Sequence, residues 1–203
     1  MPEITEIPFD YSTLSLSEED EFRTRSPGLH LTDITRAMLL EAGLAKWKEE
    51  KDPNKKKMQF EKGFLFERII QHCLKTQMEK DVRDSRGALY RPGEYLDSAV
   101  MGTPDAINLQ ESVLEEWKAT AISPKNLTKD NLFYEKPEWK WAAGWHCEHF
   151  GLDSVVFRIW HHREFDPTIK QYKATFTPSE LRDNKEKILN FAYYKGMLNH
   201  PSS

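Results

Sequence analysis

Hydrophobic side chains recur with two different periods along the chain. Over residues 32–80 most apolar positions lie three to four residues apart, which is the period of helices with one buried face. From residue 88 onward the apolar runs are short and β-branched, as in strands, and helical spacing returns at 138–150 and after residue 177. This order predicts a mixed α/β domain whose sheet begins with antiparallel strands.

Capping and turn residues set the expected ends of these elements. Four helices are predicted, one from Thr32-Asp33 to Gly43, one over 58–80, one over 138–150 and one from the capping box Thr177-Pro178-Ser179-Glu180 to about Lys195. Five strands are predicted, over 88–91, 95–108, 113–119, 154–160 and 172–176, with turns at Pro92-Gly93 and Asn108–Ser112.

The longest predicted helix, 58–80, carries two unfavourable residues on its apolar stripe. Gly63 costs up to about 1 kcal/mol relative to alanine in a helix. Glu67 is a carboxylate that is costly to bury unless another group pairs with it. Two such choices four residues apart suggest a functional site. The alternative is that Glu67 lies at the edge of the stripe and extends its carboxylate into solvent.

Composition narrows the class of protein. The chain has 203 residues, 38% hydrophobic and 31% charged, which fits one globular domain. Its two cysteines, Cys73 and Cys147, exclude a disulfide scaffold and a four-cysteine metal site within the chain. No apolar run approaches the roughly 18 residues of a membrane helix, and the first residues do not form a signal peptide. We therefore expect a cytoplasmic protein without a membrane partner.

Charge is distributed unevenly along the chain. Residues 1–26 carry a net charge of −5, whereas the whole chain carries −4, so the rest has a net charge of +1. This predicts an acidic N-terminal arm over 1–27 and a single domain over 28–203. A nearly neutral body can still bind a polyanion through a local basic patch.

The predicted hairpin of residues 95–119 gathers ionisable side chains. Glu116 and Lys118 are two apart in a strand and share a face, and Asp105 can lie beside Glu116 across the hairpin. Carboxylate oxygens are suitable ligands for Mg²⁺ or Mn²⁺, and a nearby lysine can orient water or stabilise developing negative charge. This grouping suits phosphodiester hydrolysis. An ordinary ion pair on an exposed hairpin face is the alternative.

The same residues resemble a known enzyme family. Pro104-Asp105, then ten residues, then Glu116-Trp117-Lys118 is similar to the signature of PD-(D/E)XK nucleases. Gly63 to Glu67, Gly102 to Asp105 and His30 to Ile34 are similar to further motifs of the RecB-like and lambda-exonuclease-like branches. The resemblance covers residues 28–160 in order. It implies an α/β restriction-endonuclease-like core, in which a central mixed sheet is flanked by helices.

The resemblance also implies roles for individual residues. Asp105, Glu116 and the backbone carbonyl of Trp117 would bind Mg²⁺, or Mn²⁺ in its place. Glu67 would add a ligand directly or through water, and Lys118 would position the nucleophile. Together Glu67, Asp105, Glu116 and Lys118 are the expected catalytic residues.

The helix expected after this strand departs from the family pattern. Trp141 and Trp145 stand where many RecB-like members have glutamine and tyrosine. They can stack on unpaired bases, but packing of the helix onto the sheet is the favoured interpretation. Lys125, Lys129 and Lys140 are the residues expected to contact DNA phosphates.

The function expected from these features is metal-dependent cleavage of DNA. The resemblance favours an exonuclease of phage-type recombination, replication or repair, acting in the cytoplasm of an infected host. A structure-specific or sequence-specific endonuclease and a catalytically silent nucleic-acid-binding module are the alternatives. DNA versus RNA, the polarity of digestion, a homo-oligomer and a recombination partner protein stay open.

Overall fold

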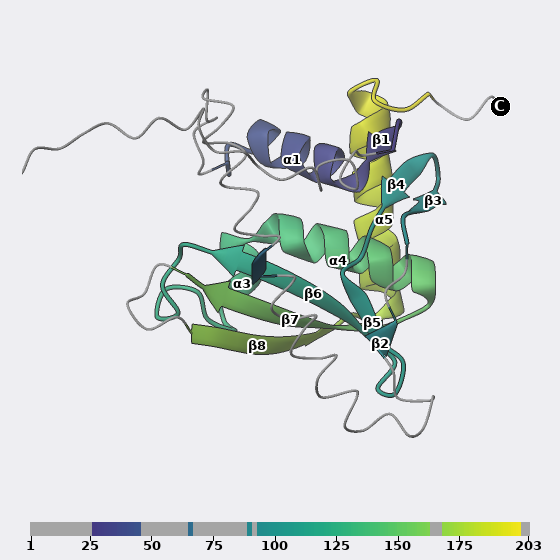
Figure 1. Ribbon diagram of the computed structural model, residues 1–203. Helices are drawn as coiled ribbons and strands as arrows, with labels where there is room; N and C mark the ends of the chain where they lie inside the picture. Colours follow the sequence, from purple (N-terminus) through teal and green to yellow (C-terminus); the bar gives the residue numbers. More distant parts are fainter. Residues whose placement is uncertain (1–25, 46–64, 67–88, 91–92, 163–167, 200–203) are drawn as a thin grey trace, which may run out of the picture.

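The computed structural model describes residues 26–45, 65–66, 89–90, 93–162 and 168–199. Its elements, in chain order, are β1 (Leu29–His30), α1 (Leu31–Glu41), β2 (Leu89–Tyr90), β3 (Tyr95–Asp97), β4 (Val100–Gly102), β5 (Ala106–Asn108), β6 (Val113–Thr120), α3 (Leu132–Glu135), α4 (Pro137–Phe150), β7 (Ser154–His161), β8 (Thr168–Thr175) and α5 (Pro178–Tyr194). The strands form a three-stranded sheet, β1-β4-β3, and a five-stranded sheet, β2-β5-β6-β7-β8 (Figure 1).

The five-stranded sheet is mixed. β6 pairs with β5 in antiparallel and with β7 in parallel orientation, and β8 is antiparallel to β7. Parallel neighbours need a crossover connection, which the segment containing α4 provides between β6 and β7. The predicted fold class is confirmed. The chain is an α/β protein with a central mixed sheet flanked by helices, consistent with the restriction-endonuclease-like core that the resemblance implied.

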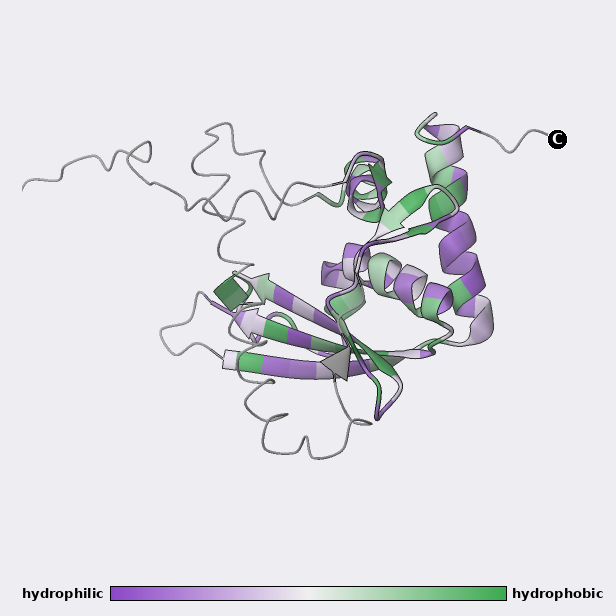
Figure 2. Cartoon of the chain, turned by 45° about the vertical axis from the view of Figure 1, so that its right-hand side comes forward, coloured by the Kyte–Doolittle hydropathy of each residue, from purple (hydrophilic) through white to green (hydrophobic). Residues whose placement is uncertain are grey.

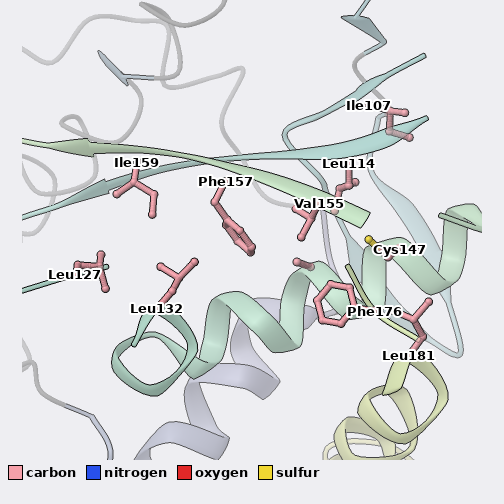
Figure 3. Packing of buried hydrophobic residues seen from close by; sticks show 11 residues of the cluster. Ile107, Leu114, Leu127, Leu132, Cys147, Val155, Phe157, Ile159, Phe176 and Leu181 are labelled. Atoms are coloured by element: carbon pink, nitrogen blue, oxygen red, sulfur yellow. The ribbon is translucent and has the colours of Figure 1, made fainter. Parts of the chain in front are cut away.

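Buried side chains lie on both faces of this sheet. Leu114, Val155 and Phe157 point from β6 and β7 toward α4 (Figure 3). With Ile159 of β7 they form one core that includes Ala143 and Cys147 of α4. On the opposite face Phe66 packs against Ala106 and Trp117. Because side chains alternate along a strand, Glu116 and Lys118 of β6 share the α4 face with Leu114. The site residues Glu116 and Lys118 therefore face α4 and not Phe66.

A second core forms between α4, α1 and α5. Trp141 and Trp145 pack there with Ile34, Ile188 and other residues of these helices. The favoured interpretation of the two tryptophans as core residues agrees with this packing, but the predicted partner was wrong. They pack α4 onto α1 and α5, because the sheet-facing side of α4 is occupied by smaller residues such as Ala143 and Cys147. α4 therefore lies between the sheet and α1 (Figure 1).

Glycine makes the contact between α4 and α5 close. A Cβ at Gly144 would meet Nδ2 of Asn184 at 2.8 Å, and this amide donates a hydrogen bond of 2.9 Å to the carbonyl of Trp141. α5 begins at the predicted capping box, in which Thr177 and Glu180 bond reciprocally. Figure 2 shows hydrophilic and hydrophobic residues mixed along α5 and along the strands of the five-stranded sheet.

Most predicted elements are present, with differences at their ends. α1 begins at Leu31 with His30 as N-cap, so the predicted cap at Thr32-Asp33 was wrong. β8 begins at Thr168, four residues before the predicted start at residue 172, and α3 was not predicted. The predicted helix 58–80 lies outside the described residues except for Leu65-Phe66, which are helical. Residues 1–25 of the predicted arm also lie outside them.

The predicted strand 95–108 is three strands. Ser98 and Ala99 have φ of 52° and 62°, and they form a two-residue turn between the paired residues Asp97 and Val100. Positive φ at both central residues is typical of type I′ hairpin turns, which usually contain Asn-Gly or a similar pair. Ser-Ala gives no such signal, so the prediction missed the turn. Thr103-Pro104 then separates β4 from β5.

Within the described ranges no helix is long and apolar enough to cross a membrane.

Candidate active site

The β5–β6 hairpin brings Asp105, Glu116 and Lys118 together. Ala106 is paired with Glu115, so Asp105, the residue before β5, lies beside Glu116. Nζ of Lys118 is 3.2 Å from Oδ2 of Asp105, and it also contacts Oε2 of Glu116. The ammonium group therefore joins the two carboxylates. These three residues are also the ones that the hairpin pattern predicted to converge.

Backbone geometry fixes the aspartate. The N–H of Trp117 donates a 2.7 Å hydrogen bond to Oδ2 of Asp105, which ties this carboxylate to the middle of β6. The indole of Trp117 points to the other face of the sheet, where its Nε1–H donates to Glu115. Arg158 holds the same Glu115 through bonds of 2.5 and 2.8 Å. Glu115 therefore belongs to an ion pair with Arg158 on the other face of the sheet, whereas its neighbour Glu116 belongs to the site.

The site has an excess of negative charge when both carboxylates are ionised. Burial and the nearby Glu116 raise the pKa of Asp105 above its usual value, against the opposing effect of Lys118. Burial opposes the charged form of Lys118, but Asp105 and Glu116 outweigh it and raise the pKa of this lysine. Lys118 is therefore an ammonium at neutral pH. One positive charge then faces two carboxylates.

The chemistry of these groups fits a divalent cation. Glu116 is only 3% exposed, and its Oε1 has no hydrogen-bond partner among the described residues. An unsatisfied buried oxygen next to a second carboxylate offers hard ligands of the kind that Mg²⁺ and Mn²⁺ take. Within the described ranges, however, no three His, Cys, Asp or Glu side chains are placed to enclose a metal ion. A complete ligand set would therefore need a backbone oxygen, water or Glu67.

Glu67 lies outside the described residues, so its predicted role stays a prediction. The residue before it, Phe66, is described and shows where the chain runs just before Glu67. Phe66 is 1% exposed and packs against Ala106 and Trp117, which directly follow Asp105 and Glu116 in the chain. Its ring also stacks on Trp160 with centroids 5.6 Å apart. The chain therefore passes close to the two site strands immediately before Glu67.

Two site residues were missed by the sequence prediction. His146 of α4 places Nε2 3.8 Å from Oε1 of Glu116, and its Nδ1 lies 2.5 Å from the hydroxyl of Tyr95 in β3. Burial and the nearby Lys118 lower the pKa of His146 to about 3, so the imidazole is neutral. Burial and the carboxylates of Asp97 and Glu116 raise the pKa of Tyr95, so its hydroxyl is protonated.

His146 directly follows Trp145, one of the two α4 positions for which the sequence predicts a role. Trp141 and Trp145 are core residues, whereas Ala142 and His146, also four apart, line a pocket beside the site. This pocket has a volume of about 200 Å³ and lies between the start of α1, β4 and α4. Its remaining lining residues are His30, Leu31, Thr32, Glu94, Met101 and Thr103.

The predicted DNA-contacting lysines occupy two places. Lys125 and Lys129 are exposed in the loop that follows β6, and Lys118 lies near the end of the same strand. Lys140 is on α4 and half-buried, with Nζ 6.0 Å from the ring centroid of Phe133. The first two lysines therefore follow the site strand, while Lys140 lies partly over an aromatic ring.

Comparisons with known proteins assign no family to this chain. No family model matches the chain, and no curated protein matches its sequence. The crystal structure of SSO0001 has a TM-score of 0.46 and 14% identity, with 86% of this chain and 82% of that chain covered. A phage-related exonuclease from Haemophilus somnus 129PT has a TM-score of 0.43 and 13% identity, with 82% and 81% covered. The function therefore has to be inferred from the residues of the site.

Proposed function

We propose that the chain is a metal-dependent nuclease that hydrolyses phosphodiester bonds in DNA. One observation carries the proposal: Lys118 is shared by the half-buried carboxylate of Asp105 and the buried carboxylate of Glu116, and Glu116 has an oxygen without a hydrogen-bond partner among the described residues. An ion pair that served stability alone would satisfy its acceptors, as Arg158 does for Glu115 with two bonds.

Each residue has a chemical task in this proposal. Asp105 and Glu116 would hold Mg²⁺ or Mn²⁺ with the backbone carbonyl of Trp117, and Glu67 would complete the set. The bound cation would neutralise charge on the phosphoryl oxygens and lower the pKa of a coordinated water. Lys118 would orient the attacking water or stabilise the negative charge that develops on the phosphate. Lys125, Lys129 and Lys140 would contact the DNA backbone.

The finer assignment rests on the resemblance of the motifs. Glu67, Asp105 and Glu116-Trp117-Lys118 follow the order of RecB-like and lambda-exonuclease-like nucleases, which favours an exonuclease in phage-type recombination, replication or repair. A homo-oligomer or a recombination protein would be the expected partner, in the cytoplasm of the host cell.

A cleavage assay on three DNA substrates tests the proposal. End-labelled linear duplex, linear single-stranded and closed circular DNA are incubated with Mg²⁺, Mn²⁺ or EDTA. We expect loss of the linear substrates with either metal and none with EDTA. Lys118→Ala and Glu116→Gln should each lower the rate by about 100-fold or more, because each removes a group that acts on the transition state. Lys170→Ala, an exposed lysine on β8, is the matched control.

The outcomes separate the competing functions. Cleavage of the closed circle would identify an endonuclease. A salt-sensitive shift of DNA without cleavage would favour a binding module. Wild-type cleavage by Lys118→Ala or Glu116→Gln would overturn the assignment of this site, whatever substrate is cut.

A further inference from the structure

The half-buried Tyr95 and the buried His146 form a pair next to Glu116 that the cleavage chemistry described above does not use. We propose that this pair is a positioning device that holds the Glu116 carboxylate in the orientation that cleavage requires. The inference rests on the proposed function, because it assigns to Glu116 the role of a metal ligand.

The two oxygens of Glu116 have different surroundings. Oε2 accepts from Lys118, whereas Oε1 faces Nε2 of His146 at 3.8 Å. Both side chains are almost fully buried, Glu116 at 3% and His146 at 4% exposure, so bulk water does not fix this carboxylate. A lone pair on Nε2 would repel the oxygen, so Nε2 carries the hydrogen. A small shift closes the contact to a hydrogen bond.

The hydrogen on Nε2 sets the direction of the second bond. In a neutral imidazole Nδ1 is then an acceptor, and the hydroxyl of Tyr95 donates to it over 2.5 Å. The order Tyr95 O–H to His146 Nδ1, and Nε2–H to Glu116, is therefore consistent throughout. It resembles in principle the arrangements in which an outer hydrogen bond fixes the tautomer and orientation of a histidine.

Tyr95 is itself held from several sides. Its ring stacks on His149 with centroids 3.8 Å apart and an interplanar angle of 9°, and it meets Phe150 edge to face. It is paired with Gly102 across β3 and β4. A Cβ at Gly102 would overlap both the ring and the hydroxyl oxygen. The tyrosine therefore occupies a place that exists because Gly102 has no side chain.

The expected effect of the pair is on turnover. A glutamate has three side-chain torsions, and a metal ligand must be held within about 0.5 Å of its productive position. Loss of an outer residue that orients a ligand typically lowers activity or metal affinity by about 10- to 100-fold. The pair contacts Glu116 and not the exposed lysines, so KM for DNA should change little.

Substitutions at residue 146 separate positioning from packing. His146→Gln can keep the bond with Tyr95 and the contact with Glu116, because its amide oxygen can accept from Tyr95 and its amide N–H can point at Glu116. His146→Leu fills a similar volume and keeps neither. We expect His146→Leu to lower kcat by about 10- to 100-fold with KM within about 3-fold of wild type, and His146→Gln to stay within about 5-fold in kcat. Tyr95→Phe should lower kcat by about 3- to 10-fold.

Mn²⁺ affinity, measured by the loss of the free-ion electron paramagnetic resonance signal, gives a readout other than activity. His146→Leu should weaken Mn²⁺ binding by about 10-fold, and His146→Gln should not. Thermal unfolding identifies a variant that does not fold. If His146→Leu is such a variant, Tyr95→Phe, which removes one oxygen atom, decides by the same two measurements.

The results distinguish this inference from the proposed function. Wild-type kcat and Mn²⁺ affinity in His146→Leu, with Lys118→Ala inactive, would overturn the positioning role and leave the nuclease intact. Equal losses in His146→Gln and His146→Leu would also overturn it, because the polar contacts that glutamine retains would then have no effect. Failure of the wild-type chain to bind Mn²⁺ would overturn both proposals.

Discussion

Gly102 leaves room for the ring of Tyr95 because it has no side chain. Gly102 belongs to the Gly102-Thr103-Pro104-Asp105 segment, which leads directly into the site. Its cross-strand partner Tyr95 lies over it, and the hydroxyl of Tyr95 reaches His146 on α4. A glycine that the family resemblance includes only as part of a motif therefore has a steric reason to be there.

Replacement of Gly102 by alanine should disturb the site through Tyr95. The added Cβ would overlap the tyrosine ring, so either β3 or the ring must move. We expect a loss of about 1–3 kcal/mol in the free energy of unfolding. We also expect a fall in kcat at least as large as that of Tyr95→Phe. Gly93→Ala is the control, because a Cβ there meets nothing within 4 Å. Equal stability and kcat in the two alanine variants would contradict this account.

Local pattern explains which site residues could be predicted. Asp105, Glu116 and Lys118 lie on one hairpin, and the two-residue period with a short turn places them together. Tyr95 and His146 are 51 residues apart and meet only because β3 and α4 lie next to each other in the folded chain. No periodicity encodes that contact. The α4 pattern indicated a buried face but left open which of two adjacent pairs, 141/145 or 142/146, faces the pocket.

Among the elements that the structure describes, α4 contacts the helices α1, α3 and α5 and the strands β6 and β7. One side contributes Ala143 and Cys147 to the sheet core, and another contributes Trp141 and Trp145 to the core with α1 and α5. Its length and its end at Gly151, with φ of 65°, were predictable from spacing and a C-terminal glycine. Its partners were not, because both sides are apolar and periodicity does not tell a sheet from a helix.

Lys185 of α5 links two elements that flank the site. It donates hydrogen bonds of 2.8 Å to Asp97 at the end of β3 and 2.7 Å to Glu148 of α4. Burial favours the neutral form of Asp97, but the bonds from Lys185 and Ser98 outweigh it and keep the pKa of this carboxyl below its usual 3.8. A lowered pKa in the folded state stabilises the fold above the unfolded pKa, and this contribution is lost as pH falls.

Lys185→Met should therefore destabilise the chain in a pH-dependent manner. At pH 7 we expect a loss of about 1–3 kcal/mol, because two charge-assisted hydrogen bonds disappear. Below about pH 4 the difference between wild type and variant should shrink as Asp97 becomes protonated. Urea unfolding at several pH values between about 2.5 and 7 measures it. Lys173→Met on the exposed strand β8 is the control, and a difference that is independent of pH would contradict the role of Asp97.

At the scale of the whole molecule, the proposed binding to DNA has to be compatible with a chain that carries a net negative charge. The chain has a net charge of −4, of which residues 1–26 carry −5, so attraction to DNA cannot come from overall charge. For the proposed function it has to come from a local group of basic side chains near the site. Lys125 and Lys129 are exposed in the loop that follows β6, the strand that bears Glu116 and Lys118.

The double variant Lys125→Ala/Lys129→Ala should lose DNA affinity in a salt-dependent manner. If each lysine neutralises one phosphate, the slope of log affinity against log salt should fall by about 2. Binding is measured in EDTA, which prevents metal-dependent cleavage during the measurement. Lys170→Ala/Lys173→Ala on β8 removes the same charge from another exposed surface, so it separates a local contact from net charge. Equal slopes for the two double variants would show that DNA does not follow the loop after β6, and the DNA path would then have to be sought along Lys140 and α4.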